Sequence, residues 1–102
     1  MNYPNVGATD QIAICDGVSA RDFDGEWIIL DLQGGNYYGL NELGGVVWHH
    51  LHAGRCAQEI AAAVAPMYAV SEQTILIDVL ALINELVERG LVRPKHRTSW
   101  ST

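Results

Sequence analysis

The stretch NYYGLNELGGVVWHHL (residues 36–51) places a short aromatic strand directly before a helix. Asn36–Leu40 is rich in tyrosine, which favours β-strands, and Asn41 is a favourable N-cap for a helix that begins at once. The chain leaves no residues between the two for another strand that could fold back and pair on this side. The sequence therefore predicts an edge strand with a free row of backbone hydrogen-bonding groups.

Two further strands precede this edge strand. Val18–Phe23 has the pattern of a strand, and the Asp-Gly pair at 24–25 fits a type I′ turn, in which both central residues have positive φ. Glu26–Leu32 (EWIILDL) is the clearest strand, and Gln-Gly-Gly at 33–35 turns the chain again. We therefore expect a three-stranded antiparallel meander, to which Ile12–Cys15 could add a short strand.

A first helix follows the sheet. It begins after Asn41 and ends at Gly54, a residue type that often follows a helix end. Gly44 and Gly45 in its first two turns cost about 1 kcal/mol each relative to alanine. We expect these two glycines to allow close packing of the helix against the sheet.

Two more helices fill the chain to about residue 91. The second begins near Cys56, and we expect Pro66, which lacks a backbone N–H, to end or kink it before Tyr68. The third is the longest, because Ser71 is a favourable N-cap and Gly90 suits the left-handed position that follows a helix. The whole pattern predicts an α+β fold, with an N-terminal three-stranded antiparallel sheet followed by three helices.

The third helix has two apolar stripes, although a surface helix needs only one. The stripes lie about 100° apart on a helical wheel, and Asp78 and Glu85 border the first of them. Such a helix is either buried on two sides or keeps one side for a partner. The first stripe consists of Ile75, Val79, Leu82 and Leu86, and the second of Leu76, Leu80, Ile83 and Val87.

The length and composition indicate one globular domain. The chain has 102 residues, of which 49% are hydrophobic and 18% charged, as in ordinary folded proteins. It has no apolar run of about 18 residues and no signal-peptide pattern at its start, so we expect a cytoplasmic protein without a membrane partner. We place the domain at 11–93, between a flexible tail at 1–10 and a flexible basic tail at 94–102.

The distribution of charge argues against a nucleic-acid partner. Residues 1–88 carry a net charge of −10 and the last fourteen residues +4, which gives −6 in all. An acidic body repels phosphate backbones, which bind to lysine and arginine. A winged-helix DNA-binding regulator remains the alternative, because Ala57–Arg89 fits a helix-turn-helix, but its recognition helix would have no basic residue before Arg89.

The sequence shows no catalytic constellation and no metal or cofactor site. His49 and His52 can share a helix face, but no acid or thiol completes a ligand set nearby. Cys56 has only Arg55 beside it to stabilise a thiolate, which is weak support for a nucleophile. We therefore expect that the protein is not an enzyme and holds no cofactor.

Three segments together resemble the PqqD family, which includes the peptide chaperone of pyrroloquinoline quinone (PQQ) biosynthesis and its relatives in other peptide-modification pathways. They are Leu30–Trp48 (LDLQGGNYYGLNELGGVVW), Ala57–Tyr68 and Asp78–Val92. The ordered series is a Tyr-Gly-Leu-Asn strand end, a helical tryptophan, Asp78 and a terminal Arg-Gly-Leu-Val. The stretch at 36–39 resembles the lasso-peptide-type branch more than the quinone-pathway chaperone.

This resemblance implies a winged-helix-like fold and a non-catalytic function. Members of the family recognise the leader segment of a ribosomally made precursor peptide, which adds a strand to the sheet by β-augmentation, in a groove closed by the third helix. The chain would then deliver this peptide to a modifying enzyme, such as a radical SAM enzyme, or to a leader peptidase. Recognition through an added strand agrees with the free edge that the residues themselves predict.

The candidate peptide-binding residues come from the edge strand and the first stripe of the third helix. Strand hydrogen bonds of ~0.5–1.5 kcal/mol each would barely offset the ordering of a free leader, so buried apolar side chains must supply most of the affinity. In the alternative arrangement the first stripe belongs to the core, and Leu76 and Leu80 face the groove. The candidates are Asn36, Tyr37, Tyr38, Gly39 and Leu40 on the strand, and Ile75, Asp78, Val79 and Leu82 on the helix.

Overall fold

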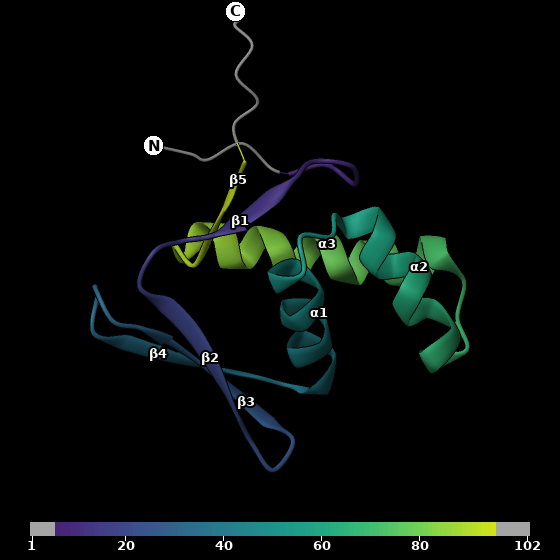
Figure 1. The fold of residues 1–102 in the computed structure, drawn as a ribbon. Coiled ribbons are helices and arrows are strands. Elements are labelled where there is room, and N and C mark those ends of the chain that lie inside the picture. The colour runs from purple at the N-terminus through teal and green to yellow at the C-terminus, as the bar shows by residue number, and fades with distance from the viewer. Residues whose placement is uncertain (1–5, 96–102) are drawn as a thin grey trace, which may run out of the picture.

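The computed structural model describes residues 6–95, so most of the two predicted tails lies outside the described residues. Figure 1 shows a three-stranded sheet at one end of the molecule and the second helix at the other. None of the helices within residues 6–95 has the length and apolar character needed to cross a bilayer. In chain order the elements are β1 (Ile12–Ile14), β2 (Val18–Phe23), β3 (Glu26–Asp31), β4 (Asn36–Leu40), α1 (Glu42–His52), α2 (Ala57–Tyr68), α3 (Glu72–Glu88) and β5 (Val92–Pro94).

The predicted antiparallel meander is confirmed. The sheet has the order β2-β3-β4, and both neighbouring pairs are antiparallel. Asp24 and Gly25, the two residues of the first hairpin turn, have φ values of 56° and 88°, as a type I′ turn requires. β4 pairs with β3 and with no other strand of the described chain, and it therefore forms one edge of the sheet.

A second, two-stranded sheet joins the two ends of the domain. The expected strand near Ile12 is present as β1, but it pairs antiparallel with β5 rather than with the meander. β5 was not predicted, because a strand of three residues gives too weak a pattern on its own. Val6 also belongs to the core, with 5% of its surface exposed, and its backbone N–H donates a hydrogen bond to Asn84 Oδ1 (2.8 Å).

The helices begin at the predicted caps. The Asn41 side chain accepts a hydrogen bond from the Gly44 N–H (2.8 Å), and the Ser71 hydroxyl accepts one from the Thr74 N–H (3.1 Å). We expected Pro66 to end or kink α2 before Tyr68; it does not end the helix, which continues to Tyr68. Pro66 lies in the last turn, and the helix continues although this residue cannot donate a hydrogen bond to the Ala62 carbonyl.

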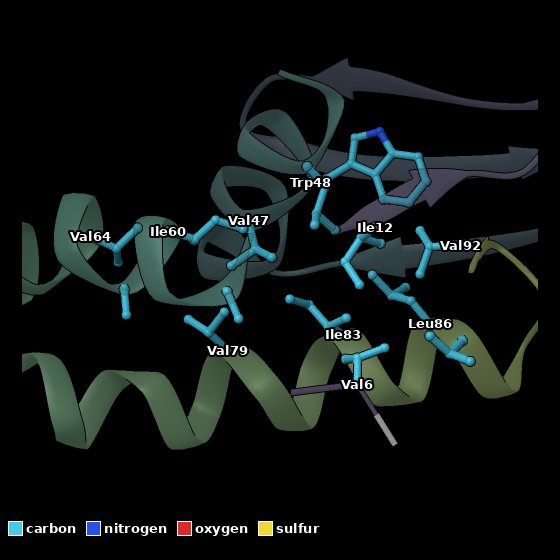
Figure 2. Close-up of a cluster of buried hydrophobic side chains, with 14 of the residues drawn as sticks. Val6, Ile12, Val47, Trp48, Ile60, Val64, Val79, Ile83, Leu86 and Val92 are labelled. Atoms are coloured by element: carbon cyan, nitrogen blue, oxygen red, sulfur yellow. The ribbon is translucent and has the colours of Figure 1, made fainter. Parts of the chain in front are cut away.

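The core lies where the three helices meet the inner face of the sheet. Figure 2 shows Val79 and Ile83 of α3 pointing toward Val47 of α1 and Ile60 of α2, and all four side chains are fully buried. Gly45 explains how α1 approaches the sheet, because a Cβ atom at this position would overlap the Trp27 ring on β3. The expected close packing of this helix against the sheet is confirmed.

Candidate functional site

The free edge of β4 exposes the backbone groups of two residues. The Leu32 N–H donates to the Gly17 carbonyl (2.9 Å) and the Gly35 N–H to the Asp31 carbonyl (2.8 Å), so residue 32 faces β2 and residue 31 faces β4. Backbone direction alternates along an antiparallel strand, so Tyr38, which is paired with Ile29, faces β3. The N–H and C=O groups of Tyr37 and Gly39 therefore point away from the sheet, toward the free edge.

The side chains of β4 point alternately to the inner and the outer face of the sheet. Tyr38 and Leu40 lie on the inner face of the sheet, half-buried against the core. Tyr37 lies on the outer face with 75% of its surface exposed. A strand added beside β4 would place every second side chain next to Tyr38 and Leu40, on the side where α3 lies.

A cleft of about 310 Å³ separates β4 from α3. Its floor includes apolar side chains from both elements, and one end carries the charged side chains of Glu85 on α3 and of Arg89, the C-cap of α3. The free edge of β4 borders this cleft. The lining residues are Tyr37, Tyr38, Gly39, Leu40, Leu82, Glu85, Leu86 and Arg89.

The cleft contains five of the nine residues that the sequence analysis proposed. Four of them are on β4, and the fifth is Leu82 on α3. Asn36 is exposed at the start of β4 but does not line the cleft. Asp78 is also exposed, one helical turn before Leu82 on the same side of α3, so it lies on the continuation of the cleft wall.

The other two proposed residues are covered by the core. Ile75 is 5% exposed and Val79 fully buried, and neither side chain lines the cleft. Leu76 and Leu80, the alternative pair, are half-buried against the core and do not line the cleft either. The part of the α3 surface between the centres of the two stripes packs into the core. Only the side of α3 that carries Asp78 and Leu82 therefore faces the cleft and its continuation.

Arg89 joins the helical wall of the cleft to the strand. Its Nε and Nη2 atoms each lie 3.2 Å from Glu85 Oε2. The carbon at the centre of its guanidinium group lies 5.1 Å from the centroid of the Tyr38 ring, a distance suited to a cation–π contact. From the sequence we named Arg89 only as the last residue of the possible helix-turn-helix and as part of the terminal Arg-Gly-Leu-Val. Its spacing of seven residues from Leu82 is the signal that could have placed it on the same wall.

A smaller hollow of about 220 Å³ lies at the opposite edge of the sheet, beside β2. Trp27, Trp48, His49 and His52 contribute to its walls. Burial, with the nearby Arg55 guanidinium as a smaller cause, lowers the pKa of His50 on the same helix. Within residues 6–95, no three histidine, cysteine, aspartate or glutamate side chains come together as a metal-binding group.

The chain is similar in sequence and in structure to known proteins. The family model of coenzyme PQQ synthesis protein D (PqqD) matches residues 26–92. Among solved structures, TbiB1 in complex with the TbiA(beta) leader peptide is 29% identical with a TM-score of 0.76, over 83% of this chain and 99% of that chain. No curated protein is similar enough in sequence to count as a match.

Two further solved structures share the fold. A lasso peptide synthetase B1 complexed with the leader peptide has a TM-score of 0.74 at 24% identity, over 81% of this chain and 98% of that chain. The PqqD truncation of Methylobacterium extorquens PqqCD, a stand-alone recognition element for ribosomally synthesised and post-translationally modified peptides, has a TM-score of 0.70 at 18% identity, over 85% and 93% of the two chains. The family match runs from β3 to β5 and so includes both walls of the cleft. The chain belongs to the PqqD family.

Proposed function

We propose that this protein is a non-catalytic recognition module that binds the leader segment of a ribosomally made precursor peptide along β4. The observation that supports this proposal most directly is the free β4 edge beside the open cleft to α3. The likeness to TbiB1, a leader-peptide complex, agrees with it. We place the protein in the lasso-peptide-type branch of the family, because of the likeness to lasso peptide synthetase B1 and the sequence at 36–39.

The leader would pair with the backbone of Tyr37 and Gly39. Two residues provide at most four hydrogen bonds, which at ~0.5–1.5 kcal/mol each roughly offset the ordering of a disordered peptide. Two inward-facing apolar side chains of the leader would add ~1.5–3 kcal/mol each on burial. They would rest on the apolar part of the cleft formed by Leu40, Leu82 and Leu86. Ile75 and Val79 then support α3 from the core rather than contact the leader.

Asp78 extends this site beyond the apolar part of the cleft. Its exposed carboxylate is on the same side of α3 as Leu82. We propose that this carboxylate binds a hydrogen-bond donor or a cation of the leader. The bound leader is then delivered to the enzyme that modifies it, such as a radical SAM enzyme, or to a leader peptidase. The alternative of a DNA-binding regulator gains no support, because α3 has no basic residue along its length and the similar structures with bound partners hold leader peptides.

A fluorescence-anisotropy titration tests the proposal. The probe is the labelled leader of a short precursor peptide sought among the genes next to this one, with a scrambled peptide as its control. Saturable binding at or below low-micromolar concentration is expected for the leader alone. Equal binding of the scrambled peptide would contradict sequence-specific recognition.

Proline substitutions show which edge of the sheet the leader pairs with. Tyr37→Pro removes one N–H from the free edge of β4 and leaves the bonds to β3 in place, so we expect a loss of leader binding of at least tenfold in a folded protein. Tyr37→Ala keeps the N–H and separates the effect of the side chain. Ala20→Pro is the matched control, because alternation directs the Ala20 N–H to the free edge of β2. Equal loss in the Tyr37 and Ala20 proline variants would contradict binding along β4.

A further inference from the structure

The backbone of Arg89 is fixed at the end of the cleft. Arg89 is the C-cap of α3, and Gly90 follows it with a φ of 75°. The Leu91 N–H donates to the Leu86 carbonyl (3.0 Å), and the Leu91 side chain is fully buried. This arrangement is a Schellman helix end with its apolar contact. The base of the Arg89 side chain therefore cannot move away from the cleft without unfolding the helix end.

The guanidinium of Arg89 keeps one edge available for a ligand. Glu85 Oε2 occupies the edge formed by Nε and Nη2, and the central carbon of the guanidinium lies over the Tyr38 ring. Among residues 6–95, no side chain or carbonyl accepts a hydrogen bond from the edge formed by the two Nη atoms. This second edge can hold a carboxylate with two parallel hydrogen bonds. The side chain is 47% exposed, so a ligand can reach this edge.

A peptide on β4 would bring one side chain to this edge. Its residue beside Tyr38 points inward, into the space between the strand and α3 that the guanidinium borders. An apolar side chain there would cover the guanidinium without pairing its free N–H groups, which is unfavourable. A lysine or arginine would meet a like charge, whereas an aspartate or glutamate would complete the guanidinium's hydrogen bonds.

We infer that Arg89 is a specificity-determining residue that selects leader peptides with an aspartate or glutamate at the inward-facing position beside Tyr38. This inference rests on the proposed function. Glu85 acts as a positioning residue, because its contact with Nε and Nη2 fixes the guanidinium and leaves the edge formed by the two Nη atoms free. Asp78 lies eleven residues earlier on α3, about 16 Å away along the helix axis, so the wall has a cation at one end and an anion at the other.

Selection from a random peptide library tests this inference without a known leader. Twelve-residue peptides displayed on cells are enriched separately on the wild-type protein, on Arg89→Glu, on Arg89→Lys and on Arg21→Glu. Arg21 is an exposed residue of β2, and its reversal makes the same change in net charge away from the cleft. The strongest peptide from the wild-type selection is then synthesised with its acidic residue and with the matching amide.

The expected result is one acidic position in the peptides enriched by the wild type and by Arg21→Glu. Arg89→Glu should enrich lysine or arginine at that position, and Arg89→Lys should weaken the acidic preference because an ammonium group lacks the planar fork. We expect the acid to bind the wild type about tenfold more tightly than the amide. Enriched peptides without an acidic position, or with one that Arg89→Glu leaves unchanged, would overturn this inference alone. A wild-type protein that enriches no peptides would overturn the proposed function and this inference with it.

Discussion

The sheet has two free edges, and they differ in what lies beside them. β4, with the sequence NYYGL, has no charged residue and borders a cleft with an apolar floor and an Arg89–Glu85 pair at one end. β2, with the sequence VSARDF, has two charged residues and borders a smaller hollow beside α1. Charged residues on an edge strand discourage the addition of another strand. We therefore expect the β4 edge rather than the β2 edge to accept a peptide, because its strand is uncharged and the cleft beside it has an apolar floor.

Gly44 and Gly45, which are adjacent on α1, pack against residues that line different hollows of the sheet. A Cβ atom on Gly45 would overlap Trp27, which lines the hollow beside β2, whereas one on Gly44 would lie 3.0 Å from Leu40 Cβ, in the cleft beside β4. We expect Gly45→Ala to lower the free energy of unfolding by about 2 kcal/mol, because overlap with a ring outweighs the gain in helix propensity.

Urea denaturation measures this loss, and leader binding is measured below the unfolding transition. Gly44→Ala is the matched variant: it should destabilise the fold less but weaken leader binding more, because it displaces a cleft residue. Equal stability of the two alanine variants would contradict the close packing of Gly45 on Trp27. Weaker binding in Gly45→Ala than in Gly44→Ala would contradict the separate support of the two edges.

One side-chain truncation in the cleft beside β4 and one in the hollow beside β2 show which edge of the sheet binds the leader. Leu82→Ala removes a half-buried side chain from the cleft wall, and we expect about tenfold weaker leader binding, since ~1.5 kcal/mol of apolar burial is lost. His52→Ala makes a comparable truncation in the hollow beside β2 and should leave binding unchanged. Anisotropy titrations of both variants measure the effect. A larger loss for His52→Ala would move the site to the β2 edge.

The parts of the fold that depend on neighbouring residues could be predicted from the sequence. The Asp24-Gly25 turn, the caps at Asn41 and Ser71 and the free edge of β4 each follow from a few consecutive residues. The pairing of β1 with β5 could not be predicted, because it joins residues about 80 positions apart and neither strand exceeds three residues.

The helical wall of the site could be predicted only in part. Two stripes on α3 showed that it is buried on more than one side, but which stripe faces the core depends on the packing of α1, α2 and Val6 around it. The sequence therefore led us to place Ile75 and Val79 in the groove and to overlook Arg89 as a cleft residue. Leu82 lines the cleft and Asp78 lies on the continuation of its wall, because both are at the margin of the first stripe.

Charge reversal at Asp78 tests the continuation of the cleft wall along α3. We expect Asp78→Lys to weaken leader binding about fivefold, since an exposed charge pair contributes ~1 kcal/mol or less. Glu88→Lys makes the same change in charge on another side of α3 and serves as the control. The difference between the variants should shrink at high salt, which screens exposed charges. Equal effects of the two reversals would show that Asp78 acts only through the net charge of the protein and not through a contact with the leader.

The smallest expected effect is a pH dependence of stability at the end of α1, on the side of the molecule away from the cleft. The lowered pKa of His50 arises first from burial and then from the Arg55 guanidinium, so the unfolded chain binds a proton more readily than the folded one. The contribution of His50 to stability is therefore present above its unfolded pKa of about 6.5 and is lost as the pH falls.

Urea denaturation of the wild type and of His50→Gln between about pH 7.5 and 5.5 measures this slope, which should be shallower in the variant. Glu59→Gln is a control with a different window. Hydrogen bonds from Cys56, led by its backbone N–H, lower the pKa of Glu59, so its contribution is lost only at more acidic pH. An unchanged slope in His50→Gln would contradict the assignment. Leader binding along β4 should not follow this slope, because neither His50 nor Arg55 lines that cleft.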